Sequence, residues 1–355
     1  MKLFNLLSLC YFLFVFQAAA QQDGPYVFNT GGKVVVKTLT GAGVVETTDV
    51  DSVRVTFPEH SNWNFAVKLR SEPKAESSEF KGAKKVFFIS DIEGEFEGFR
   101  ALLLANCVID SAYNWIFGKG QVVVCGDLFD CGMNVPEELW LLYKLEASAK
   151  LSGGYVHTIL GNHDVMNLSG DLRYVQPKYF ESAKRLGLDY MALYAVDTEL
   201  GRWLRSKNTI EKIGDNLCMH AGIAPRINQL AMPLDSINQK CRPYYDKAKI
   251  LKGVGDSSVD PFFKGETSLF WYRGYFMEPK ATEAEVSESL RLYGVKRIVV
   301  GHTIVPGNVG FYYGGKVLGL DVDEHDHVHQ AAFFDRGKWY KVDEKGMKTE
   351  LSMVN

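Results

Sequence analysis

Five short apolar runs in this 355-residue chain are each followed within two residues by a polar residue that can bind a cation, and this repeated pattern constrains the fold more than any other feature. The runs cover residues 86–90, 122–125, 156–160, 217–219 and 298–300, and a sixth covers 317–320. Helical patterns lie between them, for example at 95–105 and 137–150. Strands that alternate with helices are typical of a layered α/β domain. We therefore predict an α/β fold in which these runs are buried strands.

The polar residues that follow the first five runs are expected to meet in space. Open α/β sheets place their functional sites at the carboxyl ends of their strands. Any single residue of this kind is more often an ordinary turn residue, but the joint pattern disfavours that interpretation. The sequence thus predicts one site assembled from several strand ends. Its candidate residues are Asp91, Glu93, Asp127, Asp130, Asn162, His163, His220 and His302.

This set of side chains predicts a pair of divalent metal ions. Carboxylates, an amide oxygen and imidazoles together suit ions of borderline hardness such as Mn, Fe or Zn. Two ions about 3.5–4 Å apart can hold a hydroxide between them and stabilise both oxygens of an in-line displacement. For Glu93 the alternative is a side chain that points into the adjoining helix. In this prediction Asp127 bridges both ions, Asp91 and Glu93 complete one site, and Asn162, His220 and His302 complete the other.

His163 is the candidate general acid. It is adjacent to the predicted ligand Asn162, and Asp130 is placed to orient its ring. A histidine held in this way can protonate the oxygen of a leaving group. The alternative is a hydrogen-bonded scaffold histidine without a role in catalysis.

Four short motifs resemble those of a known family. G-D-x-x-D at 126–130, G-N-H-D at 161–164, H-A-G at 220–222 and G-H-T at 301–303 resemble the calcineurin-like metallophosphoesterases. The stretches 161–175 and 269–275 resemble the Shewanella-like branch of the phosphoprotein phosphatases. This resemblance implies a four-layer αββα sandwich, a dinuclear metal site and a phosphoprotein substrate, with Ser/Thr and Tyr left undecided.

Two departures from the family pattern affect the predicted site. The first motif of the family is D-x-H, whereas this chain has Glu93 in the histidine position, which changes the identity or affinity of the first metal. The family's second motif usually ends in D-R-G, whereas Cys131 stands here in place of the arginine and removes a bidentate phosphate contact. Arg173 and Arg273, together with Asn162, are the candidates to contact the phosphate instead. The alternative for Arg173 is a surface or lid salt bridge, and Arg273 also has a structural alternative.

The domain layout begins with a predicted signal peptide at residues 1–20. Met1 and Lys2 precede an apolar stretch at 3–16, and small residues follow at 18–20. A retained anchor is the alternative, but the stretch is shorter than the roughly 20 residues of a spanning helix. We predict a secreted or periplasmic protein without a stable membrane span. Residues 21–84 form a β-rich extension and linker, whose strands we expect to extend the core sheets. The catalytic domain covers 85–335 with a helical cap at about 165–210, either structural or a lid, and 336–355 form a tail.

Charge and cysteine content limit the remaining possibilities. The formal net charge is −3, from 40 Lys and Arg against 43 Asp and Glu, so no basic excess indicates nucleic-acid binding. Cys125 and Cys218 lie in apolar runs and are expected to be buried thiols, whereas Cys107, Cys131 and Cys241 are possible disulfide partners. A second cluster follows the sixth run, and we interpret it as a solvated turn rather than a metal site. It contains Asp321, Asp323, His325, His327 and His329.

The sequence therefore predicts a secreted metal-dependent phosphatase that cleaves phosphate monoesters by in-line attack of a metal-bridging hydroxide. Its partner would be a phosphorylated protein. A phosphatase of small phosphomonoesters or nucleotides is the enzymatic alternative. A metal-binding module with little turnover is the alternative of another class, but such a module would not need His163 and Asp130.

Overall fold

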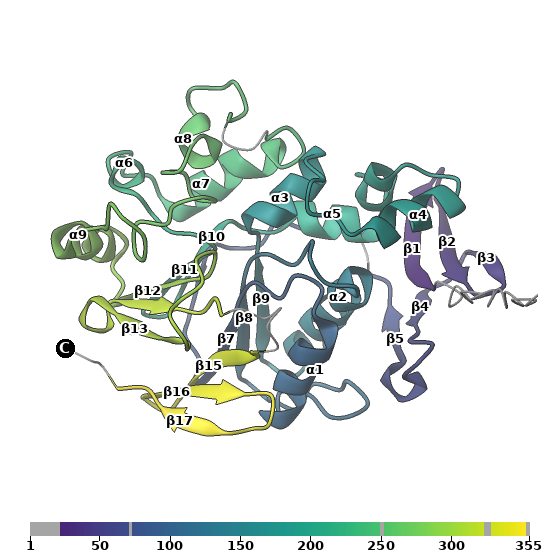
Figure 1. The fold of residues 1–355 in the computed structure, drawn as a ribbon, viewed down its shortest axis with the longest axis horizontal. Coiled ribbons are helices and arrows are strands. Elements are labelled where there is room, and N and C mark those ends of the chain that lie inside the picture. Colours follow the sequence, from purple (N-terminus) through teal and green to yellow (C-terminus); the bar gives the residue numbers. More distant parts are fainter. Residues whose placement is uncertain (1–21, 71–72, 249–251, 323–327, 353–355) are drawn as a thin grey trace, which may run out of the picture.

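The computed structural model describes residues 22–70, 73–248, 252–322 and 328–352. Two six-stranded sheets form its centre (Figure 1). The first core sheet has the order β17-β16-β15-β7-β8-β9, and the second has the order β13-β14-β12-β11-β10-β6. All six predicted strands are present. They are β7 (Lys85–Ile89), β8 (Gln121–Cys125), β9 (Tyr155–Ile159), β11 (Asn216–Met219), β12 (Arg297–Val300) and β14 (Val317–Gly319).

The alternation of side chains along these strands produces the layers. On β7, Val86 and Phe88 face the second core sheet and share an apolar cluster with Cys218. Phe87 and Ile89 point the other way, into a larger cluster with the helices. Both faces are covered, which explains why these strands read as continuous apolar runs. The predicted four-layer α/β arrangement is confirmed.

Helices cover the outer faces of both sheets. α1 (Phe96–Ala105) and α2 (Val135–Leu151) match the two predicted helices and lie on the first core sheet. α7 (Leu234–Cys241) packs on β10 (Ile210–Ile213) of the second, and α9 (Glu283–Tyr293) packs on α6. The shorter elements of this half are α6 (Pro225–Asn228), α8 (Asp260–Phe263) and β13 (Gly310–Tyr312).

The N-terminal strands do not extend the core sheets, so that expectation is wrong. β1 (Asp23–Thr30), β2 (Lys33–Thr40) and β3 (Gly43–Thr48) form a separate antiparallel sheet, and β4 (Ser52–Val55) forms a two-stranded sheet with β5 (Phe65–Lys68). Both units pack on α2, where the indole N–H of Trp140 donates a 2.8 Å hydrogen bond to the Pro25 carbonyl. The predicted linker contributes a short strand, β6 (Glu79–Phe80), which pairs in parallel with β10.

Within the predicted tail at 336–355, the described residues 336–352 belong to the core. β16 (Lys338–Asp343) and β17 (Lys348–Glu350) continue the first core sheet through β15 (Gln330–Asp335), which pairs antiparallel with β7. Trp339 packs on Phe88 at the edge of the apolar cluster between the sheets. The predicted end of the catalytic domain at residue 335 is therefore wrong, because it falls between β15 and β16, which pair in one sheet.

The helical block after β9 contains α3 (Asn162–Ser169), α4 (Pro177–Arg185) and α5 (Glu199–Arg205). It packs against the N-terminal sheet, where the rings of Tyr26 and Tyr194 meet edge to face and Asn29 donates its backbone N–H to Asp197. This anchoring favours the structural interpretation of the cap over that of a lid. No helix of the described residues is long and apolar enough to cross a membrane, and the predicted signal peptide lies outside them.

Candidate metal centre and active site

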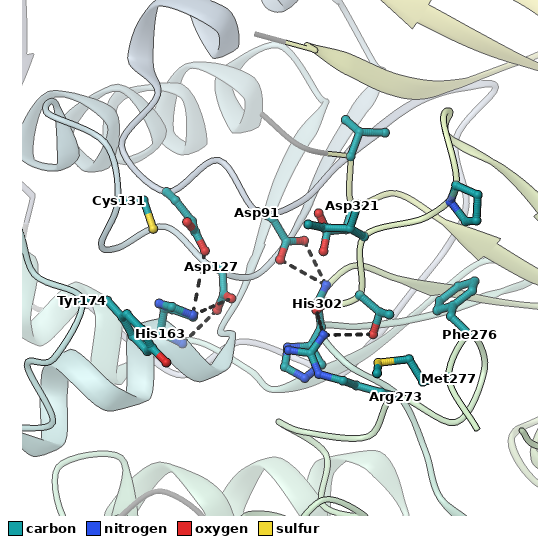
Figure 2. A pocket seen from close by; sticks show the side chains of 15 residues that line it. Asp91, Asp127, Cys131, His163, Tyr174, Arg273, Phe276, Met277, His302 and Asp321 are labelled. Carbon is teal, nitrogen blue, oxygen red and sulfur yellow. Dashed lines mark hydrogen bonds and ion pairs between the residues drawn. The ribbon is translucent and has the colours of Figure 1, made fainter. Parts of the chain in front are cut away.

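The carboxyl ends of strands from both core sheets meet around one pocket of about 530 Å³ (Figure 2). Residues that follow β7, β8 and β9 of the first sheet and β12 and β14 of the second line it, and β11 ends at His220, which contacts Asp127. The predicted rim therefore spans two sheets. The lining includes the predicted residues Asp91, Glu93, Asp127, His163, Arg273 and His302. Asn162 and His220 lie behind Asp127, at 2% and 1% exposure.

The backbone of the site is held in an unfavourable conformation. Of the eleven non-glycine residues with positive φ in the described chain, five are predicted site residues. Such residues persist only where the surrounding structure fixes them, and they cluster at functional sites. The five are Asp91 (53°), Glu93 (48°), Asp127 (55°), Asp130 (84°) and His302 (66°).

Glycines beside these residues allow the loops to approach closely. A Cβ atom on Gly301 would lie 2.1 Å from Oδ2 of Asp91, and one on Gly161 would lie 2.0 Å from Oδ1 of Asp127. Both distances are far below van der Waals contact. The G-N-H-D and G-H-T motifs therefore need their glycines to make room for carboxylates from neighbouring strands.

Asp127 lies at the centre of the polar network. Its Oδ2 is 3.1 Å from Nε2 of His220, and its Oδ1 accepts a 2.9 Å hydrogen bond from the backbone N–H of His163. Burial opposes its ionisation, but the imidazoles of His220 and His163 outweigh burial and hold the pKa of Asp127 below its usual range. Asp127 is thus a carboxylate poised to remain charged.

The surroundings of His220 fit a bound cation. Its Nδ1 lies 2.9 Å from the Cys125 carbonyl, which can only accept, so Nδ1 carries the proton. Nε2 then faces two further oxygens, Oδ1 of Asn162 at 2.8 Å and Oδ2 of Asp127. Either Nε2 is also protonated or a cation lies between these groups. Burial lowers the pKa of His220, but Asp127 and Asp91 outweigh it and raise the pKa to about 9.

His302 gives a second indication of a cation. Its Nε2 is buried and has no hydrogen-bond partner among the described residues. A buried nitrogen without a partner is costly, and coordination of a metal would satisfy it. Nitrogen or oxygen atoms of Asp127, His220 and His302 lie within 4.8 Å of one another, as do those of Glu93, Asp127 and His163. The two groups share Asp127, so the residues present fit a metal centre.

Asp91 packs against the backbone of the His302 loop. Its two carboxylate oxygens accept from the backbone N–H of His302 at 3.1 and 3.0 Å. Burial, with added repulsion from Asp127 and Glu93, raises the pKa of Asp91 to about 7 in spite of His220. A divalent cation would remove this repulsion.

His163 and Asp130 form the predicted pair. Nδ1 of His163 lies 2.7 Å from Oδ2 of Asp130, whose Oδ1 accepts from Asn167 at 2.8 Å. Nε2 of His163 faces the pocket, 3.9 Å from oxygens of both Glu93 and Asp127. Burial lowers the pKa of His163, but Asp127, Asp130 and Glu93 outweigh it and raise the pKa to about 11. Tyr174 covers the ring, with centroids 5.2 Å apart.

The structure separates the two arginine candidates. Arg273 lines the pocket, and its Nη1 donates to the His302 carbonyl and, at 3.4 Å, to Oγ1 of Thr303. Arg173 does not line the pocket, and its half-exposed guanidinium makes a bidentate pair with Asp171 at 2.9 and 2.6 Å. The salt-bridge alternative therefore describes Arg173. Cys131 lines the wall beside His163, in the place of the usual arginine.

Asp321 was missed as a site residue. The solvated-turn interpretation is wrong for it, because it is 6% exposed and lines the pocket. Burial and the carboxylates of Asp91, Glu93 and Asp127 raise its pKa to about 10. Asp321 directly follows the sixth apolar run. The pattern of a polar residue after a buried strand, which predicted the other site residues, therefore also applies to Asp321. Asp323, His325 and His327 lie outside the described residues, and His329 packs on Gly98.

Asp164 is a second missed residue, with a supporting role. Its carboxylate accepts from the backbone N–H groups of Gly161, Leu128 and Asp127 at 2.7, 2.8 and 3.2 Å. It ties the loop after β9 to the loop after β8. Cys125 and Cys218 are fully buried, as predicted, while Cys107 and Cys241 are free thiols, exposed and buried respectively.

The sandwich and the side chains at its rim define a metal-dependent hydrolase of phosphate esters. A model of the calcineurin-like phosphoesterases matches residues 84–306, and the chain belongs to that family. It is a metal-dependent phosphatase, as the sequence predicted.

Similar proteins confirm the resemblance to the Shewanella-like branch. Shewanella-like protein phosphatase 2 of Arabidopsis thaliana is 26% identical over 288 residues, covering 68% of this chain and 72% of that protein. Shewanella-like protein phosphatase 1 of Plasmodium berghei is 27% identical, covering 72% of this chain and 71% of that protein. A crystal structure of the cold-active protein-tyrosine phosphatase of a psychrophilic Shewanella species has a TM-score of 0.85 at 35% identity, covering 94% of this chain and all of that chain.

Proposed function

We propose that this protein is a secreted phosphoprotein phosphatase that binds two divalent cations and acts on phosphotyrosine. The observation that carries the proposal is the pair of ligand groups that share Asp127. Two cations held there, Mn, Fe or Zn, would supply Lewis-acid stabilisation and an activated water. Asp91 and Glu93 would hold one of them, and Asn162, His220 and His302 the other.

The protein's own side chains would handle the phosphate and the proton. Arg273 lines the pocket and donates to the carbonyl of the predicted ligand His302. Its guanidinium is therefore placed to bind the oxygens of a phosphate held at the metal ions. His163 points Nε2 into the pocket and would donate the proton from that atom to the leaving oxygen. Asp130 fixes the ring through Nδ1, so the donor atom faces the substrate.

The shape of the pocket supports an aromatic leaving group. Phe276 and Met277 lie on one side of the pocket, and Tyr174 stands on the other, beside His163 (Figure 2). Ile304 and Pro306 add to the apolar lining. Ile304 is 59% exposed and Met277 51%, so both offer free apolar surface. The ring of phosphotyrosine would gain from this surface, whereas phosphoserine offers no ring. The similar Shewanella enzyme is itself described as a protein-tyrosine phosphatase. The apolar N-terminal stretch followed by small residues supports export.

A substrate panel tests the proposal. Purified protein with Mn²⁺ is expected to hydrolyse p-nitrophenyl phosphate, and to prefer a phosphotyrosine peptide over the phosphoserine peptide of the same sequence. Ile304→Ser is expected to lower kcat/KM for the phosphotyrosine peptide more than for the phosphoserine peptide. Ile116→Ser, at an exposed position away from the pocket, is the matched control. Equal activity on both peptides would remove the phosphotyrosine assignment, and no hydrolysis with Mn, Fe or Zn would remove the enzyme assignment.

A further inference from the structure

Asp321 is held in a fixed position beside the His302 loop. It follows β14, which pairs in parallel with β12, the strand that ends before His302. Leu320 donates its backbone N–H to the Val300 carbonyl at 2.8 Å, and the Asp321 carbonyl accepts from Val305 at 2.9 Å. These bonds on both sides fix the direction of the side chain. Figure 2 shows its carboxylate beside that of Asp91.

The surroundings of this carboxylate are negative. Asp321 is only 6% exposed, and the carboxylates of Asp91, Glu93 and Asp127 all repel its charge. Within the part of the chain that the structure describes, no side chain donates a hydrogen bond to it or forms an ion pair with it. Arg273 attracts it, but the guanidinium contacts His302 and Thr303 instead. A buried carboxylate in this position either takes up a proton or gains a positive partner, and a bound cation would be such a partner.

Asp321 lies on the same side of the pocket as Glu93, the residue at which the first motif departs from the family pattern. The chain has Glu93 where an imidazole is usual, so apart from His163, which we assign as the general acid, the side chains on this side offer only oxygen atoms. Four carboxylates around one cation favour a hard ion such as Mn²⁺ or Mg²⁺ over Zn²⁺. The other side of Asp127 keeps two imidazoles, His220 and His302, which suit softer ions.

We propose that Asp321 is a further carboxylate ligand of the cation held by Asp91 and Glu93, which makes this half of the centre selective for a hard cation. The inference rests on the proposed function only in that it needs a cation at Asp91 and Glu93.

Metal binding, measured without substrate, tests the inference. The metal-free protein and its Asp321→Asn variant are titrated with Mn²⁺, with calorimetry for affinity and elemental analysis for the number of ions per chain. The wild type is expected to bind two ions. In Asp321→Asn the affinity for one of them should fall ~10–100-fold, the range seen when groups that support a metal site are removed. Asp335→Asn is the control, because Asp335 ends β15 outside the pocket. Asp321→Glu keeps the carboxylate and should retain both ions.

Thermal unfolding separates a ligand from a merely structural residue. In the metal-free protein Asp321 is a buried acid among acids, so Asp321→Asn should unfold at a higher temperature than the wild type. With saturating Mn²⁺ the order should reverse, because the wild type gains more from the cation. A structural role would lower the unfolding temperature of the variant in both states. That result, or Mn²⁺ affinities within twofold of the wild type, would overturn the inference.

The same titration distinguishes this inference from the proposed function. A wild type that binds a single ion, lost in Asp321→Asn, supports the inference and contradicts the dinuclear proposal. A wild type that binds two ions, both unchanged in the variant, contradicts only the inference. A single ion that is unchanged in the variant contradicts both.

Discussion

The two halves of the proposed metal centre are prepared to bind a cation in different ways. In the imidazole half, Asn162, His220 and His302 are oriented by contacts within the protein, such as the bond from His220 to the Cys125 carbonyl. In the carboxylate half, Asp91 and Asp321 are buried near each other, and burial raises the pKa of both. Asp127 belongs to both halves.

The difference shows which half should respond more to the bound ion. A preorganised imidazole pair binds a metal with little rearrangement. Crowded carboxylates repel one another until a cation neutralises them. We therefore expect the imidazole half to keep its geometry without metal, whereas the carboxylate half should depend on the cation for its charge balance and decide which cation is bound.

The largest effect is expected where the halves meet. Asp127→Asn removes a charged ligand that both share, so affinity for both ions should fall together. Loss of Lewis-acid stabilisation worth several kcal/mol implies a decrease in kcat/KM of ~10⁴-fold or more with p-nitrophenyl phosphate. Elemental analysis after gel filtration checks the metal content. If only one ion were lost, Asp127 would belong to one half alone.

His163 provides the next largest effect. Its ring lies beside Glu93 and Asp127, but we assign it to proton donation and not to metal binding. His163→Asn should lower kcat by ~10²–10⁴-fold while both ions remain bound. The loss should be larger for phenyl phosphate than for p-nitrophenyl phosphate, since the poorer leaving group needs the proton more. Asp130→Asn should reproduce this dependence on the leaving group more weakly, because the ring loses its orientation but stays. Equal losses for both substrates would show that His163 does not act as the acid.

Glu93→His tests the carboxylate half directly. An imidazole at this position restores the usual ligand type and should make the two halves more alike. We expect the ratio of Zn²⁺ to Mn²⁺ affinity at the weaker site to rise about tenfold, in line with the preference of imidazole for softer ions. Competition titrations followed by elemental analysis measure this ratio. An unchanged ratio would mean that Glu93 does not coordinate the ion.

Much of this centre could be predicted from the sequence because strand ends are local features. Apolar runs followed by Asp, Asn or His reveal which residues share a rim, and the same rule extends to Asp321. The sequence did not reveal the left-handed backbone of Asp91, Asp127 and His302, because the contacts that hold it come from other strands.

The remaining errors of prediction concern packing between distant segments. Arg173 and Arg273 both lie in family-like stretches, but only the tertiary structure shows that Asp171 holds Arg173 away from the pocket. The N-terminal segment alternates between apolar and polar residues and was expected to extend the core sheets, yet its strands pack on α2 and α5 instead. Residues 338–343 also alternate, and their partner β15 was not recognised.

The smallest expected effect is a change in stability caused by Glu137, a buried carboxylate outside the proposed metal centre. It shows how burial alone affects a carboxylate that has no cation to neutralise it. Glu137 lies in the first turn of α2 at 4% exposure. Burial, with a contribution from Asp23, raises its pKa to about 7 from an ordinary 4.5, although Lys178 opposes this. Because the folded-state pKa is the higher one, the contribution of Glu137 to stability is fully present below about pH 4.5 and is lost as the pH rises through about 7.

Glu137→Gln should remove this loss. Between pH 5 and pH 8 the variant should gain about 2–3 kcal/mol in the free energy of unfolding relative to the wild type, measured by urea titration at each pH. Glu97→Gln, at an exposed position in the first turn of α1, serves as the control and should show no such gain. Mn²⁺ should leave the Glu137→Gln difference unchanged, whereas it should reverse the effect of Asp321→Asn. If Mn²⁺ changed the stability differences of Glu137→Gln and Asp321→Asn by the same amount, its effect would not come from neutralising the carboxylates of the metal centre.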